Sequence, residues 1–197
     1  MRRSGAGGVI AGTVGTVADA DQPLRDLLRG SFAYAAQRTM RRLDGLTDEE
    51  YFWEPAPGCW TVRRVGGGIV TDGSWPPPDP PPVTTIGWRL VHVCSFLRDH
   101  WLRPVAFGVE PAPERPVPET AAAALIAVAG AIAAWQHDLD GVDDERLWAP
   151  MGPAAAPYSE GTVASFVEHI HDEFIHHAAE VALLRDLYRA GATVNRS

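Results

Sequence analysis

The sequence predicts an all-α protein in which four helices form a bundle, with a long irregular crossover between the first and second helices. Four stretches carry apolar residues at the i, i+3, i+4 spacing of an amphipathic helix. No stretch alternates apolar and polar residues over a convincing strand length. A segment rich in proline and glycine separates the first two helical stretches, as in bundles that contain one long connection.

The first predicted helix covers residues 21–44, where Leu24, Leu28 and Phe32 begin the apolar face. Residues 47–50 read as an N-cap and first turn of a short helical piece. The second helix should begin after residues 84–85 and run to Trp101 or Leu102. The third should cover residues 119–139 after a favourable first-turn proline, and the fourth residues 162–190 before a glycine.

The crossover, residues 51–83, is broken repeatedly by proline and glycine and closes with a proline run over residues 76–82. Trp53, Trp60 and Trp75 fall within it. Because large aromatic side chains usually pack against a core, we expect these tryptophans to anchor the crossover on the bundle.

The length of 197 residues suits one domain, which we expect over residues 21–190, with a disordered tail at 1–20 and a short tail at 191–197. The first twenty residues superficially resemble a secretory signal, but five glycines and the absence of leucine argue against one. A net charge of -8 argues against nucleic acid as a partner, and no segment predicts a membrane span.

The two cysteines, Cys59 and Cys94, are too far apart in sequence to form a close-spaced metal or redox pair. So few thiols suggest a reducing, cytoplasmic setting, and Cys94 should be a buried, inert thiol. All 17 cationic side chains are arginine, so no lysine can form a Schiff base.

The fourth helix carries two carboxylate–imidazole pairs at i, i+4 spacing, Asp172/His176 and Glu173/His177. Glu173 and His177 share a stripe with large apolar residues, so they should point into the bundle, whereas Asp172 and His176 should lie nearer solvent. A buried carboxylate beside an imidazole requires compensation, which a bound cation provides.

His92 strengthens this interpretation because it shares a face of the second helix with Trp88 and Phe96. Two histidines and one carboxylate would leave an open coordination position, as in a catalytic zinc site or a six-coordinate iron or nickel site. The alternative for His92 is a hydrogen-bonded core histidine.

Simpler roles are expected for the neighbouring polar residues. His169 and His171 should lie at the surface, and His176 beside the ligands or at the rim of the site. Glu180 could pair with a buried arginine. Arg185 and Asp186 most simply form a charge pair at the helix end.

Four motifs resemble the DinB-like superfamily, which includes the mycothiol-dependent maleylpyruvate isomerase and other thiol-dependent transferases. They are LTDEEYFWEP (residues 46–55), GCWTVR (58–63), TIGWRLVH (85–92) and EFIHHAAEVALLRDLY (173–188). The resemblance covers residues 23–189 and implies an up-down-down-up bundle. It also implies one metal ligand on the second helix and an i, i+4 pair on the last, and matching the family's later Gln or Glu to Glu180 selects His177.

The superfamily most often uses three histidines, and Glu173 stands in place of one, as in the isomerase, where a His, Glu, His set binds zinc. The resemblance therefore implies a metal-dependent enzyme with ligands His92, Glu173 and His177. A low-molecular-weight thiol such as mycothiol would act on a small electrophile in a transfer or isomerisation reaction.

Trp60, Arg63 and Trp88 are expected to line the substrate pocket, with Arg63 pairing an acidic group. Asp172, His176 and Glu180 are expected next to the ligands or at the rim. A metal-dependent hydrolase and a non-catalytic, stress-related metal-binding bundle are the alternatives. The expected partner is a small molecule, and homodimer formation is compatible with such a bundle.

Overall fold

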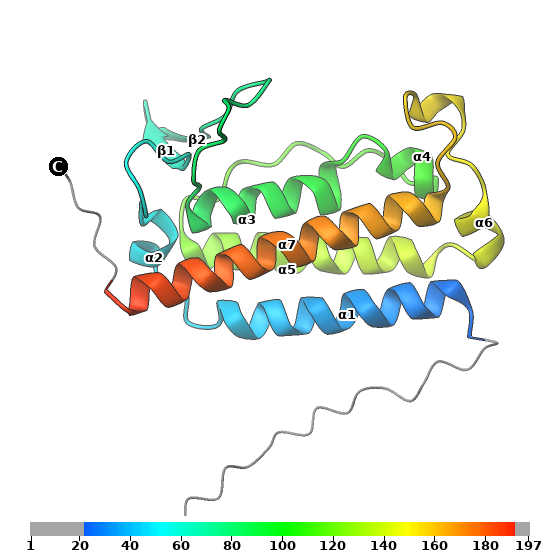
Figure 1. The fold of residues 1–197 in the computed structure, drawn as a ribbon, viewed down its shortest axis with the longest axis horizontal. Coiled ribbons are helices and arrows are strands. Elements are labelled where there is room, and N and C mark those ends of the chain that lie inside the picture. Colours follow the sequence, from blue (N-terminus) through cyan, green and yellow to red (C-terminus); the bar gives the residue numbers. More distant parts are fainter. Residues whose placement is uncertain (1–21, 192–197) are drawn as a thin grey trace, which may run out of the picture.

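The computed structural model describes residues 22–191 and contains four long helical segments that pack as a bundle (Figure 1). They are α1 (Leu24–Leu43), α3 (Ile86–Cys94), α5 (Ala121–Asp140) and α7 (Val163–Arg189). α1 and α3 each pack against both α5 and α7. The predicted all-α bundle is confirmed. The tails expected at residues 1–20 and 191–197 lie, apart from Gly191, outside the described residues.

The second helix differs from its prediction, which was one continuous helix to Trp101 or Leu102. α3 ends at Cys94 and continues as the π-helix η1 (Ser95–Asp99), followed by the short helix α4 (Arg103–Phe107). α5 and α7 begin near the expected residues because threonine caps them: Thr120 accepts from Ala123 N–H and Thr162 from Ser165 N–H, each at 3.1 Å.

One short helix and one β-hairpin lie between α1 and α3. α2 (Asp48–Phe52) begins with the capping box of Thr47 and Glu50, as the sequence indicates. β1 (Val62–Val65) and β2 (Gly68–Thr71) form an antiparallel hairpin, which the sequence did not predict because each strand has only four residues. The remaining short elements are α6 (Asp144–Trp148) and the 3-10 helix η2 (Pro153–Ala155).

Two of the three crossover tryptophans anchor the loop. The Trp53 ring contacts Tyr188 at a centroid distance of 5.6 Å, and the Trp60 ring contacts Trp88 at 5.7 Å. Trp75 is 93% exposed, so its predicted anchoring role is wrong. The loop also approaches α3 at Gly87, where a β-carbon would lie 2.8 Å from Val62 Cγ2 and 3.0 Å from Tyr51 O.

The buried faces of the four helices form one apolar core. Its largest fully buried side chains include Phe32, Leu97, Trp135 and Phe174. Burial of each such side chain contributes about 1.5–3 kcal/mol of transfer free energy. Helix α5 has the length and composition to cross a membrane, with a mean hydropathy of 1.3, but it packs between α1 and α3, and core helices of soluble proteins satisfy the same criterion.

A buried ion pair closes one end of the bundle. Arg185 on α7 is 1% exposed, and its Nη2 lies 2.8 Å from Glu50 Oε2. The same guanidinium donates to the carbonyls of Arg42 and Asp44 at the end of α1. The predicted Arg185–Asp186 charge pair is therefore wrong: Arg185 pairs with Glu50 across 135 residues, and Asp186 pairs with Arg42.

His171, expected at the surface, is instead a core residue that is 6% exposed. Its Nε2 accepts from Trp135 Nε1–H at 3.1 Å, and its ring stacks on Phe32 at 4.8 Å. Burial lowers the pKa of His171 from 6.5 to about 4, because the charged imidazolium would lose its hydration there.

The Glu50–Arg185 pair gives the first prediction. Replacement Glu50→Gln keeps the side-chain volume but leaves the buried guanidinium without a counter-charge, so the free energy of unfolding should fall by about 3–5 kcal/mol. Urea denaturation measures this change. Asp186→Asn, which breaks an exposed pair, is the matched control and should lower the free energy by less than about 1 kcal/mol. Equal effects of the two substitutions would contradict a dominant role for the buried pair.

The pKa of His171 gives the second prediction. As pH falls from 6.5 towards 4, the unfolded chain takes up a proton at this residue that the folded chain excludes, so stability should drop by about 3 kcal/mol. His171→Gln keeps an acceptor for Trp135 and should reduce the slope of stability against pH in this range. Thermal melts of both proteins between pH 7 and pH 4 measure it, and identical slopes would show that His171 is not the group responsible.

Candidate metal centre

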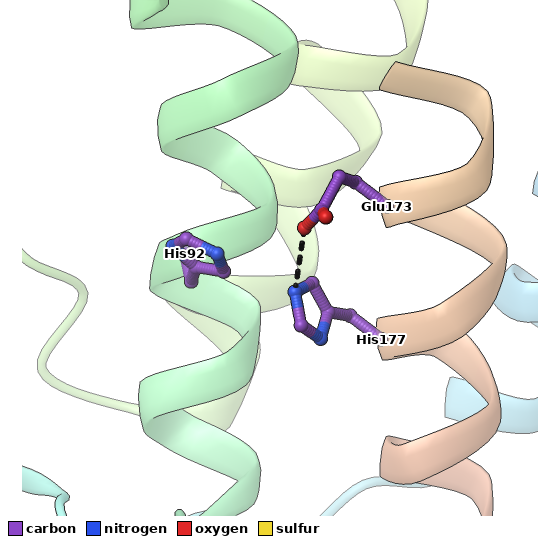
Figure 2. A group of neighbouring side chains, drawn as sticks. All are labelled: His92, Glu173 and His177. Carbon is purple, nitrogen blue, oxygen red and sulfur yellow. Dashed lines mark hydrogen bonds and ion pairs between the residues drawn. The ribbon is translucent and has the colours of Figure 1, made fainter. Parts of the chain in front are cut away.

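Two neighbouring helices bring the three predicted ligands together. His92 projects from α3, and Glu173 and His177 project from successive turns of α7 toward it (Figure 2). The donor atoms of the three side chains all lie within 4.8 Å of one another. His177 points into the bundle as the helical phase predicts, whereas Glu173 faces the other ligands with a side chain that stays partly exposed.

The three side chains differ in their access to solvent. His177 is 6% exposed, His92 is partly buried, and the Glu173 side chain is 35% exposed. The His92 and His177 ring centroids lie 4.9 Å apart with an interplanar angle of 70°. The group is thus anchored in the core at His177 and reaches the protein surface at Glu173.

The Nδ1 atom of His177 is contacted by the side chains of Glu180 and Arg89. His177 Nδ1 lies 2.7 Å from Glu180 Oε2, and Arg89 lies 3.0 Å and 3.1 Å from the two Glu180 oxygens through Nε and Nη2. His177 Nδ1 also lies 3.1 Å from Arg89 Nη1, which can only donate and would need a lone pair on that nitrogen. The shorter contact, to the Glu180 carboxylate, favours a proton on Nδ1 instead. The lone pair then belongs to Nε2, as a metal ligand requires.

The His177–Glu173 contact shows how this donor set fits a cation. His177 Nε2 lies 3.1 Å from Glu173 Oε2, as the dashed line in Figure 2 marks. In the Nε2–H tautomer the ring donates to Glu173, whereas in the Nδ1–H tautomer, which the short Glu180 contact favours, this contact brings two hydrogen-bond acceptors together. Either a second proton on the ring or a cation is needed to offset their repulsion, and a divalent ion liganded by imidazole and carboxylate satisfies both atoms.

His92 lies among aromatic rings. Its ring stacks on Trp88 at 5.0 Å and meets the edge of Phe96 at 5.4 Å. Burial, with a further contribution from nearby His177, lowers the pKa of His92 from 6.5 to about 4. The ring is therefore neutral at pH 7, the form in which imidazole binds a metal.

A second group of potential ligands, His176, His177 and Glu180, is a weaker candidate. The His176 side chain is 62% exposed, and Glu180 already pairs with Arg89, whose positive charge disfavours a cation there. His176 and Asp172 are exposed, as the helical phase predicts, and so is His169. Glu180 pairs with Arg89, which is the arginine partner that the sequence suggested without identifying it.

The three predicted pocket residues have different surroundings. Trp88 lies against His92, but its Nε1 donates to Asp72 O at 2.7 Å, and Trp60 packs on its other side. Arg63 pairs with Asp72 at 2.8 Å and with Glu54 at 3.5 Å. Its guanidinium is thus already paired, contrary to the expectation that it awaits an acidic group.

Sequence reasoning missed two residues that organise this region, Arg89 and Asp72. Arg89 stands in the TIGWRLVH motif three residues before His92, and this spacing placed it within reach of the same neighbouring helix. Asp72 left no comparable signal, because its partners Thr61, Arg63 and Trp88 meet only through the folded hairpin.

Fold and site together define a class of helical bundle with a candidate metal centre between two antiparallel helices. A family model described as the DinB superfamily matches residues 31–181, and the chain belongs to that superfamily. No curated protein matches the chain.

Among solved structures, the chain is similar to the "conserved protein of locus from Enterococcus faecalis". The TM-score is 0.56 at 15% identity, with 86% of this chain and 99% of that chain covered. This likeness concerns the fold alone.

Proposed function

We propose that His92, Glu173 and His177 bind one divalent metal ion, zinc in the first instance and iron or nickel as alternatives, and that the protein is a metal-dependent enzyme. The observation that carries the proposal is the approach of His177 Nε2 to Glu173 Oε2 while Nδ1 is held by Glu180. Two histidines and one carboxylate leave a coordination position for a reactant.

The side chains around the triad have separate tasks in this proposal. Glu180 fixes the orientation and tautomer of His177, and Arg89 fixes Glu180 from α3. Trp88 holds the His92 ring by stacking and is itself held by Asp72. These contacts set the ligand positions before any ion arrives, which reduces the reorganisation needed for binding.

The metal would lower the pKa of a bound thiol or water and so supply a nucleophile near neutral pH. We infer that the nucleophile comes from outside the chain. Burial raises the pKa of the Cys94 thiol to about 12, and burial also raises the pKa of Cys59. Neither cysteine offers a thiolate at neutral pH.

The resemblance to thiol-dependent transferases favours a low-molecular-weight thiol of the mycothiol type over water. The reaction would then be transfer of that thiol to a small electrophile, or an isomerisation through its adduct. A panel of thiols and electrophiles, with water alone as the comparison, separates this activity from hydrolysis. Absence of turnover with every pair by metal-loaded protein would favour the non-catalytic bundle.

The metal content of purified protein tests the site directly. Wild-type protein prepared without a histidine tag should contain near one equivalent of metal by mass spectrometry, and His177→Ala should contain almost none, because it removes a ligand. His176→Ala is the matched control, one residue away and exposed, and should retain the metal. Loss of metal in both variants would favour the second ligand group, and negligible metal in wild type would remove the basis of the enzyme proposal.

The pair of Glu180 and Arg89 gives a further prediction. Glu180→Gln weakens the acceptor of the His177 proton, and Arg89→Met releases Glu180, so each should reduce metal affinity by about 10–100-fold. Competition with a chromogenic chelator measures the metal affinity. Thermal melting of the metal-free variants shows whether the substitutions also change the stability of the fold. Unchanged affinity in both variants would show that the Glu180 contact does not support the ligand.

A further inference from the structure

A cavity of about 360 Å³ lies between the start of α7, the residues after η1 and the loop that follows α6. These segments meet at the end of the bundle where α4 lies in Figure 1. Five rings line the cavity: His100, Trp101, Tyr158, Phe166 and His169. Its volume falls within the range of small-molecule sites.

The cavity lies along α7 from the triad, toward the start of that helix. His169 lines the cavity and precedes Glu173 by four residues, a rise of about 6 Å along the helix. On the facing side, the Phe96 ring contacts both His92 at 5.4 Å and His177 at 5.9 Å. The His100 ring, beyond Phe96 in sequence, contacts Phe166 at 5.3 Å. Phe96 thus contacts two of the three candidate ligands and lies four residues before His100, which lines the cavity.

The opposite side of the triad is filled by protein. Trp88 covers the His92 ring, Trp60 packs on Trp88, and Asp72 fixes both Trp88 and Arg63. Trp60, Arg63 and Trp88, which were expected to line the substrate pocket, thus pack against other protein groups on this side of the triad. A space for a small molecule lies on the other side of the triad along α7, where His169 lines the cavity.

The lining of this cavity defines the chemistry of its ligand. It contains no arginine, aspartate or glutamate, so it offers no fixed charge to an ionised group. Leu102 N–H donates to His100 Nδ1 at 3.2 Å, which leaves Nε2–H of the neutral ring as a donor. Burial lowers the pKa of His100, which favours that neutral form.

We propose that this cavity binds an uncharged aromatic molecule that carries an oxygen acceptor, and that it holds the substrate of the neighbouring metal centre. The assignment of this molecule as the substrate of the metal centre rests on the proposed function. The rings supply stacking surface, and His100 supplies a donor for the oxygen. The reacting part of the substrate then lies toward Phe96 and Glu173, whose side chain is partly exposed.

2-Naphthol is the probe for this proposal, and calorimetric titration of the metal-free protein measures its binding. Ser165→Phe fills the cavity from α7 and should weaken binding by at least about tenfold. Glu168→Phe, on the exposed face three residues along the same helix, is the matched control and should bind as wild type does. If Ser165→Phe fails to fold, Tyr158→Ala on the exposed loop should also weaken binding.

Absence of 2-naphthol binding, or equal binding by all these variants, would overturn the cavity assignment. Tighter binding of 2-naphthoate than of 2-naphthol would overturn the uncharged ligand class. Because these titrations use metal-free protein, their outcome is independent of the metal proposal.

Proton relaxation of bound 2-naphthol in cobalt-loaded and zinc-loaded protein tests the link to the triad. Faster relaxation in the cobalt form supports a ligand next to the metal. Equal relaxation in two fully loaded forms overturns the substrate role, whereas failure to load either metal defeats the metal proposal alone.

Discussion

The ion pair of Arg185 and Glu50 is the constraint on which the bundle depends, because it joins three elements at one buried point. Arg185 belongs to α7, Glu50 caps α2, and the same guanidinium binds the carbonyls that end α1. Burial pushes the pKa of Glu50 upward, but Arg185, the Thr47 N–H and Arg189 outweigh that effect and keep it lowered. The carboxylate therefore stays charged, and α7 is fixed along its axis relative to the start of the crossover that leads to α3.

That axial position matters because the candidate ligands come from different helices. A slide of one turn, about 5.4 Å, would separate His92 from His177 completely. The polar contacts of α7 follow one another along the helix: Glu173 meets His177, Glu180 meets Arg89, and Arg185 meets Glu50. Each contact satisfies a charge or imidazole that the apolar core could not hold alone. The same interactions that hold α7 in register thus also position the candidate metal centre.

The sequence predicts the long helices and the shared face of Glu173 and His177 because both follow from local periodicity. Prediction from the sequence fails where the interaction partner is distant along the chain. Arg185 pairs with Glu50 across 135 residues, and His171 accepts a hydrogen bond from Trp135 on another helix. No local pattern distinguishes a buried arginine or histidine with such a partner from an exposed one. The cavity was missed for the same reason, since three separate segments line it, and the tryptophans that suggested a pocket instead pack on one another.

The π-helix η1 adds one residue to a turn of the second helix directly after the segment that carries His92. Relative to a continuous α-helix, this rotates every later residue by about 100° while leaving His92 unmoved. His100, the residue directly after η1, meets Phe166 at the cavity. Single-residue insertion or deletion within Ser95–Asp99 is consequently an evolutionary route by which related chains could exchange the residues that contact a ligand while conserving the metal-binding triad.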